Sequence, residues 1–253
     1  MRAEREQGFW DERVPSLEEC CDLVAAGPDV NTVRAIELLQ PLDHATVLDL
    51  GCGAGIFAAW LGREGARVTG IDVSAGQIER AAELHEVLGL QSRFVAAAVS
   101  RDALGSESFD RLAGRYVLHH LDPPSVTPEL ASLLRLGGKA AFVETMGLNP
   151  ILRFARTRLV GRCGIPRYGT EDERPLTGDD LRALEEGFGT LRLATGEMQF
   201  LRILDRQILH YRSRTASRAL DTLDDLLLRA GFSRWSYHQV VYLERTTAMR
   251  PTY

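Results

Sequence analysis

The sequence is poor in several residue types, and each shortage excludes a class of protein. It has four cysteines among 253 residues, at positions 20, 21, 52 and 163, and their spacing matches no zinc motif. We therefore expect free thiols in a reducing compartment. Lys139 is the only lysine, so arginine carries nearly all the positive charge, and the net charge is -5. This balance argues against a broad nucleic-acid-binding surface.

Long apolar runs are also missing. No stretch approaches the roughly 20 apolar residues that a membrane-spanning helix needs. The first eight residues are mostly polar and lack the apolar core of a signal peptide. We therefore expect a cytoplasmic protein that contacts no membrane. The hydrophobic content of 45% is ordinary for a globular protein, and the length allows one large domain.

Residues 46–55 organise the rest of the chain. They read Thr-Val-Leu-Asp-Leu-Gly-Cys-Gly-Ala-Gly, and their apolar start is typical of a buried strand. The alternate glycines Gly51, Gly53 and Gly55 then predict a sharp turn whose backbone a ligand can approach closely. The apolar residues that follow predict a helix, whose first N–H groups point back at that ligand. A glycine-rich turn between a strand and a helix is typical of nucleotide binding.

Two acids indicate which ligand fits this turn. Asp49 lies two residues before the first glycine, where a carboxylate repels a pyrophosphate but attracts an ammonium group. Ile56 occupies the place where a dinucleotide-binding turn has its third glycine. Asp72 ends the next predicted strand, where it can accept hydrogen bonds from ribose hydroxyls. Asp72 suits NAD and S-adenosylmethionine (SAM) alike, but the two acids together favour SAM, which has an ammonium group and no phosphate.

Further motifs extend this pattern. Gly-Ile-Asp-Val-Ser follows at 70–74, Ser-Phe-Asp at 108–110, Tyr-Val-Leu-His-His-Leu-Asp at 116–122 and Leu-Gly-Gly-Lys at 136–139. With the glycine turn, they resemble the class I SAM-dependent methyltransferases, small-molecule bacterial stand-alone type, over residues 44–146. The resemblance implies an α/β fold with a Rossmann-like seven-stranded sheet of order 3-2-1-4-5-7-6. It also implies that strand 7 is antiparallel, that helices cover both faces and that helical elements form a cap. The implied cofactor is SAM, with S-adenosyl-L-homocysteine as product.

The resemblance also implies a set of cofactor-binding residues. These are Asp49, Gly51, Cys52, Gly53, Gly55, Asp72, Val73, Gln77, Ala98, Val99 and Arg115. One position departs from the family. Many relatives carry an acid four residues after the aromatic that opens strand three, and counting from Phe94 reaches Ala98. Either Asp102 takes that role from the following loop, or backbone N–H groups and apolar contacts hold the adenine.

The order of motifs predicts how the chain is divided. We expect one methyltransferase domain over 1–253, with a helical cap at 1–45, a SAM-binding core at 46–146 and a C-terminal half at 147–253 with substrate-side insertions. Either the leading helices cover the substrate pocket or they pack against the sheet. Strands are predicted at 46–50, 67–71, 92–97, 110–117, 138–146, 191–200 and 235–243. Helices are predicted at 54–64, 74–88, 124–135, 176–187 and 201–230, the last broken near 213–217, with a loop-rich segment at 147–176.

Methyl transfer is a direct displacement, in which the acceptor atom must be aligned with the methyl group. A hydroxyl acceptor must also lose a proton, and histidine is the commonest base. We predict His119 as the catalytic base, His120 as second choice and Glu144 as the group that orients the base. The alternative is that a histidine only packs under the turn and that positioning alone suffices. His238 is expected to be structural. No carboxylate cluster accompanies the histidines, so no metal is expected.

Five arginines, at positions 153, 156, 158, 162 and 167, lie in the loop-rich segment. They form either a solvated face or a site for an anionic acceptor. We expect an enzyme that methylates a small molecule at a hydroxyl, with specialised metabolites as one acceptor class, and that is a monomer or homodimer. Alternatives are N- or C-methylation, and a SAM-binding cyclase or regulatory protein that transfers no methyl group.

Overall fold

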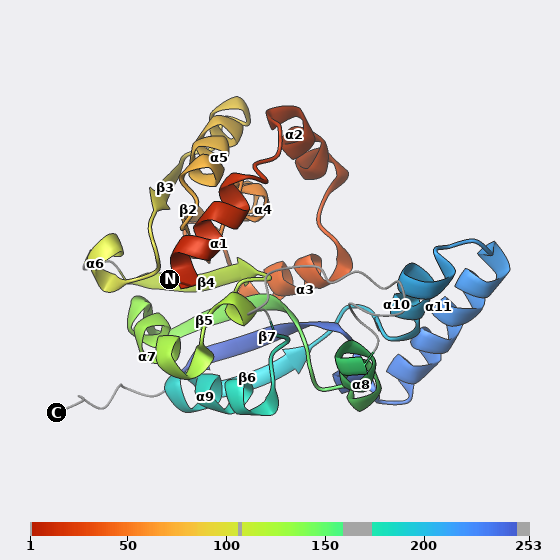
Figure 1. The fold of residues 1–253 in the computed structure, drawn as a ribbon. Coiled ribbons are helices and arrows are strands. Elements are labelled where there is room, and N and C mark those ends of the chain that lie inside the picture. Colours follow the sequence, from red (N-terminus) through yellow and green to blue (C-terminus); the bar gives the residue numbers. More distant parts are fainter. Residues whose placement is uncertain (1, 106–107, 159–173, 247–253) are drawn as a thin grey trace.

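The structure is a computed structural model, which describes residues 2–105, 108–158 and 174–246 (Figure 1). A seven-stranded sheet of order β3-β2-β1-β4-β5-β7-β6 carries the fold. Neighbours from β3 to β5 are parallel, and β7 runs antiparallel to both β5 and β6. The predicted order and strand directions are therefore confirmed. The strands are β1 (Thr46–Leu50), β2 (Arg67–Asp72), β3 (Ser92–Ala96), β4 (Phe109–Arg115), β5 (Leu134–Thr145), β6 (Gly189–Ala194) and β7 (His238–Arg245).

Helices cover both faces of the sheet, because side chains alternate between the two faces of each strand. Val47 belongs to a core that also holds Leu39 and Ala58, whereas Leu48 belongs to a second core with Leu130 and Leu184. The first core holds buried side chains from α2 (Leu17–Ala26), α3 (Val30–Leu39), α4 (Ile56–Arg63) and α5 (Ala75–Val87). The second holds those from α6 (Arg101–Leu104), α7 (Pro123–Leu133) and α9 (Gly178–Phe188).

The remaining helices lie beyond the layered core. α1 (Arg2–Asp11) contacts α5. Figure 1 shows α8 (Pro150–Arg158), α10 (Leu201–Leu204) and α11 (Arg214–Arg229) grouped beyond the arrowhead of β6. A π-helical turn over Asp205–Leu209 joins α10 to α11, so the predicted break in this helical segment falls just before Arg214. Across the described ranges, no helix has the length and apolar character needed to cross a bilayer.

The segment predicted as loop-rich at 147–176 contains helix α8, so that prediction was wrong for its first part. Pro150 occupies the first turn, where a missing N–H costs nothing. Asn149 is buried, and its Oδ1 accepts the N–H groups of Ile151 at 2.9 Å and Leu152 at 3.2 Å. Arg153, Arg156 and Arg158 therefore lie on a capped helix, whereas Arg162 and Arg167 lie outside the described residues.

Further element boundaries differ from prediction: β5 begins at Leu134 rather than at residue 138, and β4 ends at Arg115 rather than at residue 117. β6 ends at Ala194 rather than at residue 200, and the Asn31 Oδ1 atom accepts the N–H of Gly196 at 2.9 Å in the turn that follows. The third predicted helix ends at Leu133, because Leu134 already pairs with Phe109 in the sheet. The last strand begins at His238, after a short 3-10 turn over Ser233–Trp235.

Candidate active site

The glycine turn packs tightly between β4 and α5. Gly51 and Gly55 have φ angles of 61° and 79°, which L side chains rarely adopt. A β-carbon on Gly51 would lie 2.6 Å from Val117 Cγ2, and one on Gly55 would lie 2.9 Å from Ala81 Cβ. The sequence therefore needs glycine at both positions. Cys52, within the turn, is buried, and burial raises the pKa of its thiol.

Asp72 ties the turn to the end of β2. Its Oδ2 accepts the N–H of Gly53 at 2.9 Å, and its Oδ1 accepts the N–H of Ser74 at 2.9 Å. The backbone of Val73 also interacts with this carboxylate. Burial raises the pKa of Asp72. Asp72 therefore holds the glycine turn, and its binding of ribose hydroxyls stays a prediction.

Asp49 is a buried carboxylate without a well-formed hydrogen bond. It is 1% exposed, and neither of its oxygens has a hydrogen-bond partner in the described chain. Burial raises the pKa of Asp49 to about 7, although the charge of Arg115 opposes this effect. An unpaired buried carboxylate is costly unless a cation or donor compensates it. The site therefore fits the ammonium group of SAM.

The other predicted cofactor residues gather at the same edge of the sheet. Val73 follows the end of β2, and Ala98 and Val99 follow the end of β3. Gln77 is buried in the first turn of α5, where its amide donates to the carbonyl oxygens of Trp10 and Arg13 at 3.4 and 3.3 Å. Asp102, the candidate replacement for the missing acid, is exposed in α6.

Arg115 lies at the end of β4 and forms an ion pair that sequence reasoning missed. Its Nη2 atom is 2.9 Å from Oδ2 of Asp29, the N-cap residue of α3. Its guanidinium also lies over the Trp60 and Tyr116 rings, with centroids at 5.5 and 5.6 Å. Arg115 thus acts on two parts of the candidate site. Its charge affects Asp49, and its ion pair with Asp29 connects it to the N-terminal helices.

The first two N-terminal helices pack against other helices of the core, and their part in covering a substrate pocket stays a prediction. α2 packs against α4 and α5. The end of α1 is held at the start of α5, where the Ser74 hydroxyl donates to Oδ1 of Asp11 at 2.5 Å. With the Gln77 contacts, this bond seats α1 beside the segment that follows Asp72.

A 3-10 turn over Leu118–His120 follows β4 and carries the two histidines. Glu144, from β5, is completely buried beneath it. Its Oε1 accepts the N–H groups of Val117 at 2.8 Å and Leu118 at 2.7 Å, and its Oε2 lies 2.8 Å from His119 Nδ1. Since a neutral ring that donates from Nδ1 keeps its lone pair on Nε2, this contact orients His119 as a proton acceptor.

His120 lies against His119, with ring centroids 4.2 Å apart. Its Nδ1 is 3.2 Å from Oε2 of Glu6, a residue of α1. The His119 and His120 side chains are only 10% and 14% exposed. The structure therefore brings the three predicted catalytic residues together and adds Glu6. The sequence carries no local signal for Glu6, because only the fold brings α1 to the end of β4.

Aromatic side chains continue from the histidine turn toward β7. Tyr116 has a φ of 55°, an uncommon conformation for an aromatic residue, and its ring centroid is 5.1 Å from that of His238. The Tyr237 ring is 4.8 Å from His238, and its hydroxyl accepts a hydrogen bond from Arg156 at 3.3 Å. Burial lowers the pKa of His238 to about 4, so this ring is neutral at physiological pH.

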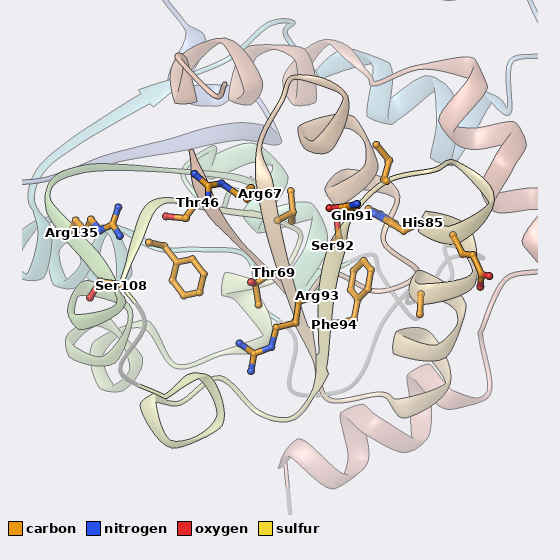
Figure 2. A pocket seen from close by; sticks show the side chains of 15 residues that line it. Thr46, Arg67, Thr69, His85, Gln91, Ser92, Arg93, Phe94, Ser108 and Arg135 are labelled. Atoms are coloured by element: carbon orange, nitrogen blue, oxygen red, sulfur yellow. The ribbon is translucent and has the colours of Figure 1, made fainter. Parts of the chain in front are cut away.

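A separate hollow of about 1040 Å3 lies at the opposite edge of the sheet. Figure 2 shows Thr46, Arg67 and Ser92 around it, which are the first residues of β1, β2 and β3. Ligands of open α/β sheets bind at the carboxyl ends of the strands. No predicted site residue lines this hollow, so the candidate active site is the carboxyl edge. In the described ranges, no three His, Cys, Asp or Glu side chains converge as metal ligands.

Comparison with known proteins agrees with this geometry. Residues 47–138 match the family model described as a methyltransferase domain. The chain is 38% identical over 127 residues to a ubiquinone biosynthesis O-methyltransferase of Paracidovorax citrulli, covering 48% of this chain and 52% of that protein. It is 36% identical over 160 residues to methyltransferase GfsG of Streptomyces halstedii, covering 62% of this chain and 56% of that protein. The chain thus spans about half the length of the curated relatives it matches.

Solved structures share the fold. The geranyl diphosphate C-methyltransferase of Streptomyces coelicolor matches with a TM-score of 0.57 and 14% identity, over 85% of this chain and 78% of that one. The [4+2]-cyclase SpnF matches with a TM-score of 0.58 and 17% identity, over 97% of both chains. The fold is the Rossmann-like fold that these solved structures share. Residues 47–138 thus match a methyltransferase domain, and SAM is the cofactor of that family.

Proposed function

We propose that this chain transfers a methyl group from SAM to a hydroxyl of a small-molecule acceptor. The His119–Glu144 pair carries the proposal. A hydroxyl is a weak nucleophile until its proton is removed, and an imidazole oriented by a carboxylate is suited to that task. The pair lies at the end of β4, next to the strand that carries Asp49 in the sheet.

Each residue has a separate task in this mechanism. When bound, SAM supplies an electrophilic methyl group. Asp49 neutralises the ammonium group of the cofactor, and Asp72 accepts hydrogen bonds from its ribose. His119 takes the acceptor proton at Nε2, and the resulting imidazolium is stabilised by the carboxylate of Glu144. Glu144 stays in place because it also accepts two backbone N–H groups.

Several helices lie at the edge of the sheet that carries the histidine turn. α1 lies on one side, and the insertions that hold α8, α10 and α11 follow β5 and β6 at the same edge. The relatives named O-methyltransferases support oxygen as the methylated atom. The net charge of -5 favours a small molecule over nucleic acid. We propose a specialised metabolite as the acceptor class. We also propose that the protein acts in the cytoplasm.

A cyclase that transfers no methyl group is the second candidate. The match to the [4+2]-cyclase SpnF along 97% of both chains supports it, since the same fold carries that activity. We place it second because a cyclisation gives no task to a base oriented like His119.

Methyl-13C-labelled SAM separates the candidates. The protein is incubated with labelled SAM and a panel of small phenols and hydroxylated compounds, and products are followed by mass spectrometry and 13C NMR. The proposal predicts labelled methoxyl groups and equal amounts of S-adenosyl-L-homocysteine. Label on nitrogen or carbon would contradict O-methylation, and an unlabelled isomerised product would favour the cyclase.

A further inference from the structure

His238 is the first residue of β7, and its half-buried ring lies at the carboxyl edge of the sheet, where it pairs with Thr145 at the end of β5. The ring packs against those of Tyr116 and Tyr237, with centroids 5.1 and 4.8 Å away. Among the residues that the structure describes, none makes a hydrogen bond or an ion pair with the ring nitrogens. A neutral imidazole has one N–H donor and one acceptor nitrogen, so this ring keeps both for a ligand or for water.

Arg206 brings a positive charge to this ring. It lies in the π-helical turn over Asp205–Leu209, which follows α10. The segment that leads into α10 is bound beside the ring, because the carbonyl oxygen of Gln199 accepts the N–H of Tyr237 at 3.0 Å. Burial lowers the pKa of His238 to about 4, and the next largest effect is the charge of Arg206. Since Coulomb interactions weaken with distance, the guanidinium lies near the ring.

Positive charge predominates among the groups that act on this ring. Within the described ranges, the guanidinium of Arg206 forms no ion pair. A second guanidinium, that of Arg156, donates to the hydroxyl of Tyr237 at 3.3 Å. Asp29 is an acid whose charge also acts on the ring, but it is paired with Arg115 at 2.9 Å. This arrangement favours an anionic ligand, because guanidinium groups match the geometry of carboxylates.

We propose that His238 and Arg206 form a subsite that binds a carboxylate of the acceptor. Arg206 supplies the charge and His238 supplies an N–H, so two donors can meet the two oxygens of the group. The rings of Tyr116 and Tyr237 form walls of this subsite. Asp205 precedes Arg206 but is 3% exposed, whereas Arg206 is exposed, so the two side chains lie on different sides of the turn.

The subsite adjoins the turn that carries the candidate base. Tyr116 lies two residues before the 3-10 turn over Leu118–His120, and His119 is among the groups whose charge acts on His238. An acceptor can therefore place its hydroxyl at His119 and its carboxylate at His238. The position of the hydroxyl rests on the proposed function. Binding of the carboxylate does not, because it requires no methyl transfer.

The test compares matched probes on the complex with S-adenosyl-L-homocysteine. Hydroxybenzoates and hydroxycinnamates are each titrated beside their carboxamides, which have a similar shape and no charge, and binding is followed by NMR and calorimetry. The wild type should bind the best acid roughly tenfold or more tightly than its amide, the range for a hydrogen bond to a charged group. Arg206→Gln should remove most of this preference. His238→Phe keeps an aromatic ring without an N–H and should also reduce it, whereas His238→Gln keeps a donor and should retain more of it.

Arg212→Gln is the matched control, since Arg212 is exposed further along the same segment and should leave the preference unchanged. The affinity for S-adenosyl-L-homocysteine should not change in any variant, which shows that each is folded. Equal binding of acids and amides by the wild type, binding of neither, or an unchanged preference in Arg206→Gln or His238→Phe would overturn the proposal. Methylation of neutral phenols would then still support O-methylation. A preference for acids that both variants lose, without methylation of any hydroxyl, would overturn only the proposed function.

Discussion

Oε2 of Glu144 lies 2.8 Å from Nδ1 of His119, and the two side chains are 0% and 10% exposed. The other oxygen of Glu144 accepts two backbone N–H groups of the turn that carries the histidine. One carboxylate therefore fixes both the ring and the backbone that presents it. This double attachment holds the His119 ring in place, which the proposed role as a base requires.

Glu144→Gln should lower both stability and turnover. The amide keeps the shape but loses the charge, and hydrogen bonds to a charged group contribute about 1.5–3 kcal/mol to stability. We expect a loss of that size in the free energy of unfolding and a fall in kcat, while SAM affinity stays near wild type. Denaturant unfolding, calorimetry and turnover measure the three quantities. Glu185→Gln, on an exposed face of α9, is the control. A variant with wild-type kcat would exclude an orienting role for Glu144.

The ionisation of Asp49 predicts an unusual pH dependence. Its pKa is about 7 in the folded chain against about 3.9 in an unfolded one. Because the folded pKa is raised, ionisation of Asp49 destabilises the fold, and this penalty grows as pH rises from about 4 to about 7. Asp49→Asn should therefore be more stable than the cofactor-free wild type by a few kcal/mol at pH 8, and similar to it at pH 4. Denaturant unfolding at both values measures this difference. Parallel pH profiles of the two proteins would contradict the assignment.

The same group should release a proton when SAM binds. At pH 6 Asp49 is mostly protonated in the free protein, and the ammonium group of SAM favours the carboxylate. Calorimetry in buffers of different ionisation enthalpy should detect release of up to one proton at pH 6. Asp49→Asn should release fewer protons and bind SAM more weakly. Equal proton release by both proteins would mean that Asp49 does not meet the ammonium group.

Variants of two α8 arginines can distinguish between two hypotheses, a site for an anionic acceptor and a solvent-exposed surface. Arg156 is half-buried and contacts Tyr237 beside His238, whereas Arg153 is exposed on the same helix. If the acceptor is anionic, Arg156→Glu should raise its KM roughly tenfold or more, the range for a lost charged hydrogen bond. Arg153→Glu should have little effect, and SAM affinity should not change. Added salt should reduce the effect of Arg156→Glu, because about 0.1 M salt screens charges beyond about 10 Å. Equal KM values for both variants would mean that the arginines of α8 form a solvated surface and do not bind the acceptor.

Sequence reasoning succeeded where a local pattern determines the structure. The apolar run before Gly51 and the glycines of the turn specify β1 and its turn, and Asp49 and Asp72 follow from their places at strand ends. The order of the sheet came from the family resemblance, because strand pairing is a long-range property. The error at α8 was avoidable, since Asn149 followed by Pro150 is a typical helix start.

Other features depend on contacts that no local pattern reveals. Asp29 meets Arg115, and Glu6 meets His120, only because the fold brings distant segments together. The early end of β6 is of the same kind, since Asn31 of α3 holds the turn that follows it. Sequence patterns therefore located the histidine turn, but not the contacts that Glu6 and Asp29 make near it.

The central claim is that His119 removes the proton of the acceptor hydroxyl, and its most direct test uses acceptors of graded acidity. Wild type and His119→Ala are compared across phenols that the wild type methylates, at one pH and saturating SAM. For phenols that are un-ionised at that pH, the variant should be about 10²–10⁴-fold slower. For phenols that are already ionised, the two proteins should react at nearly equal rates, because no proton remains to be removed. A loss of the same size for every phenol, or no loss for any, would contradict the account.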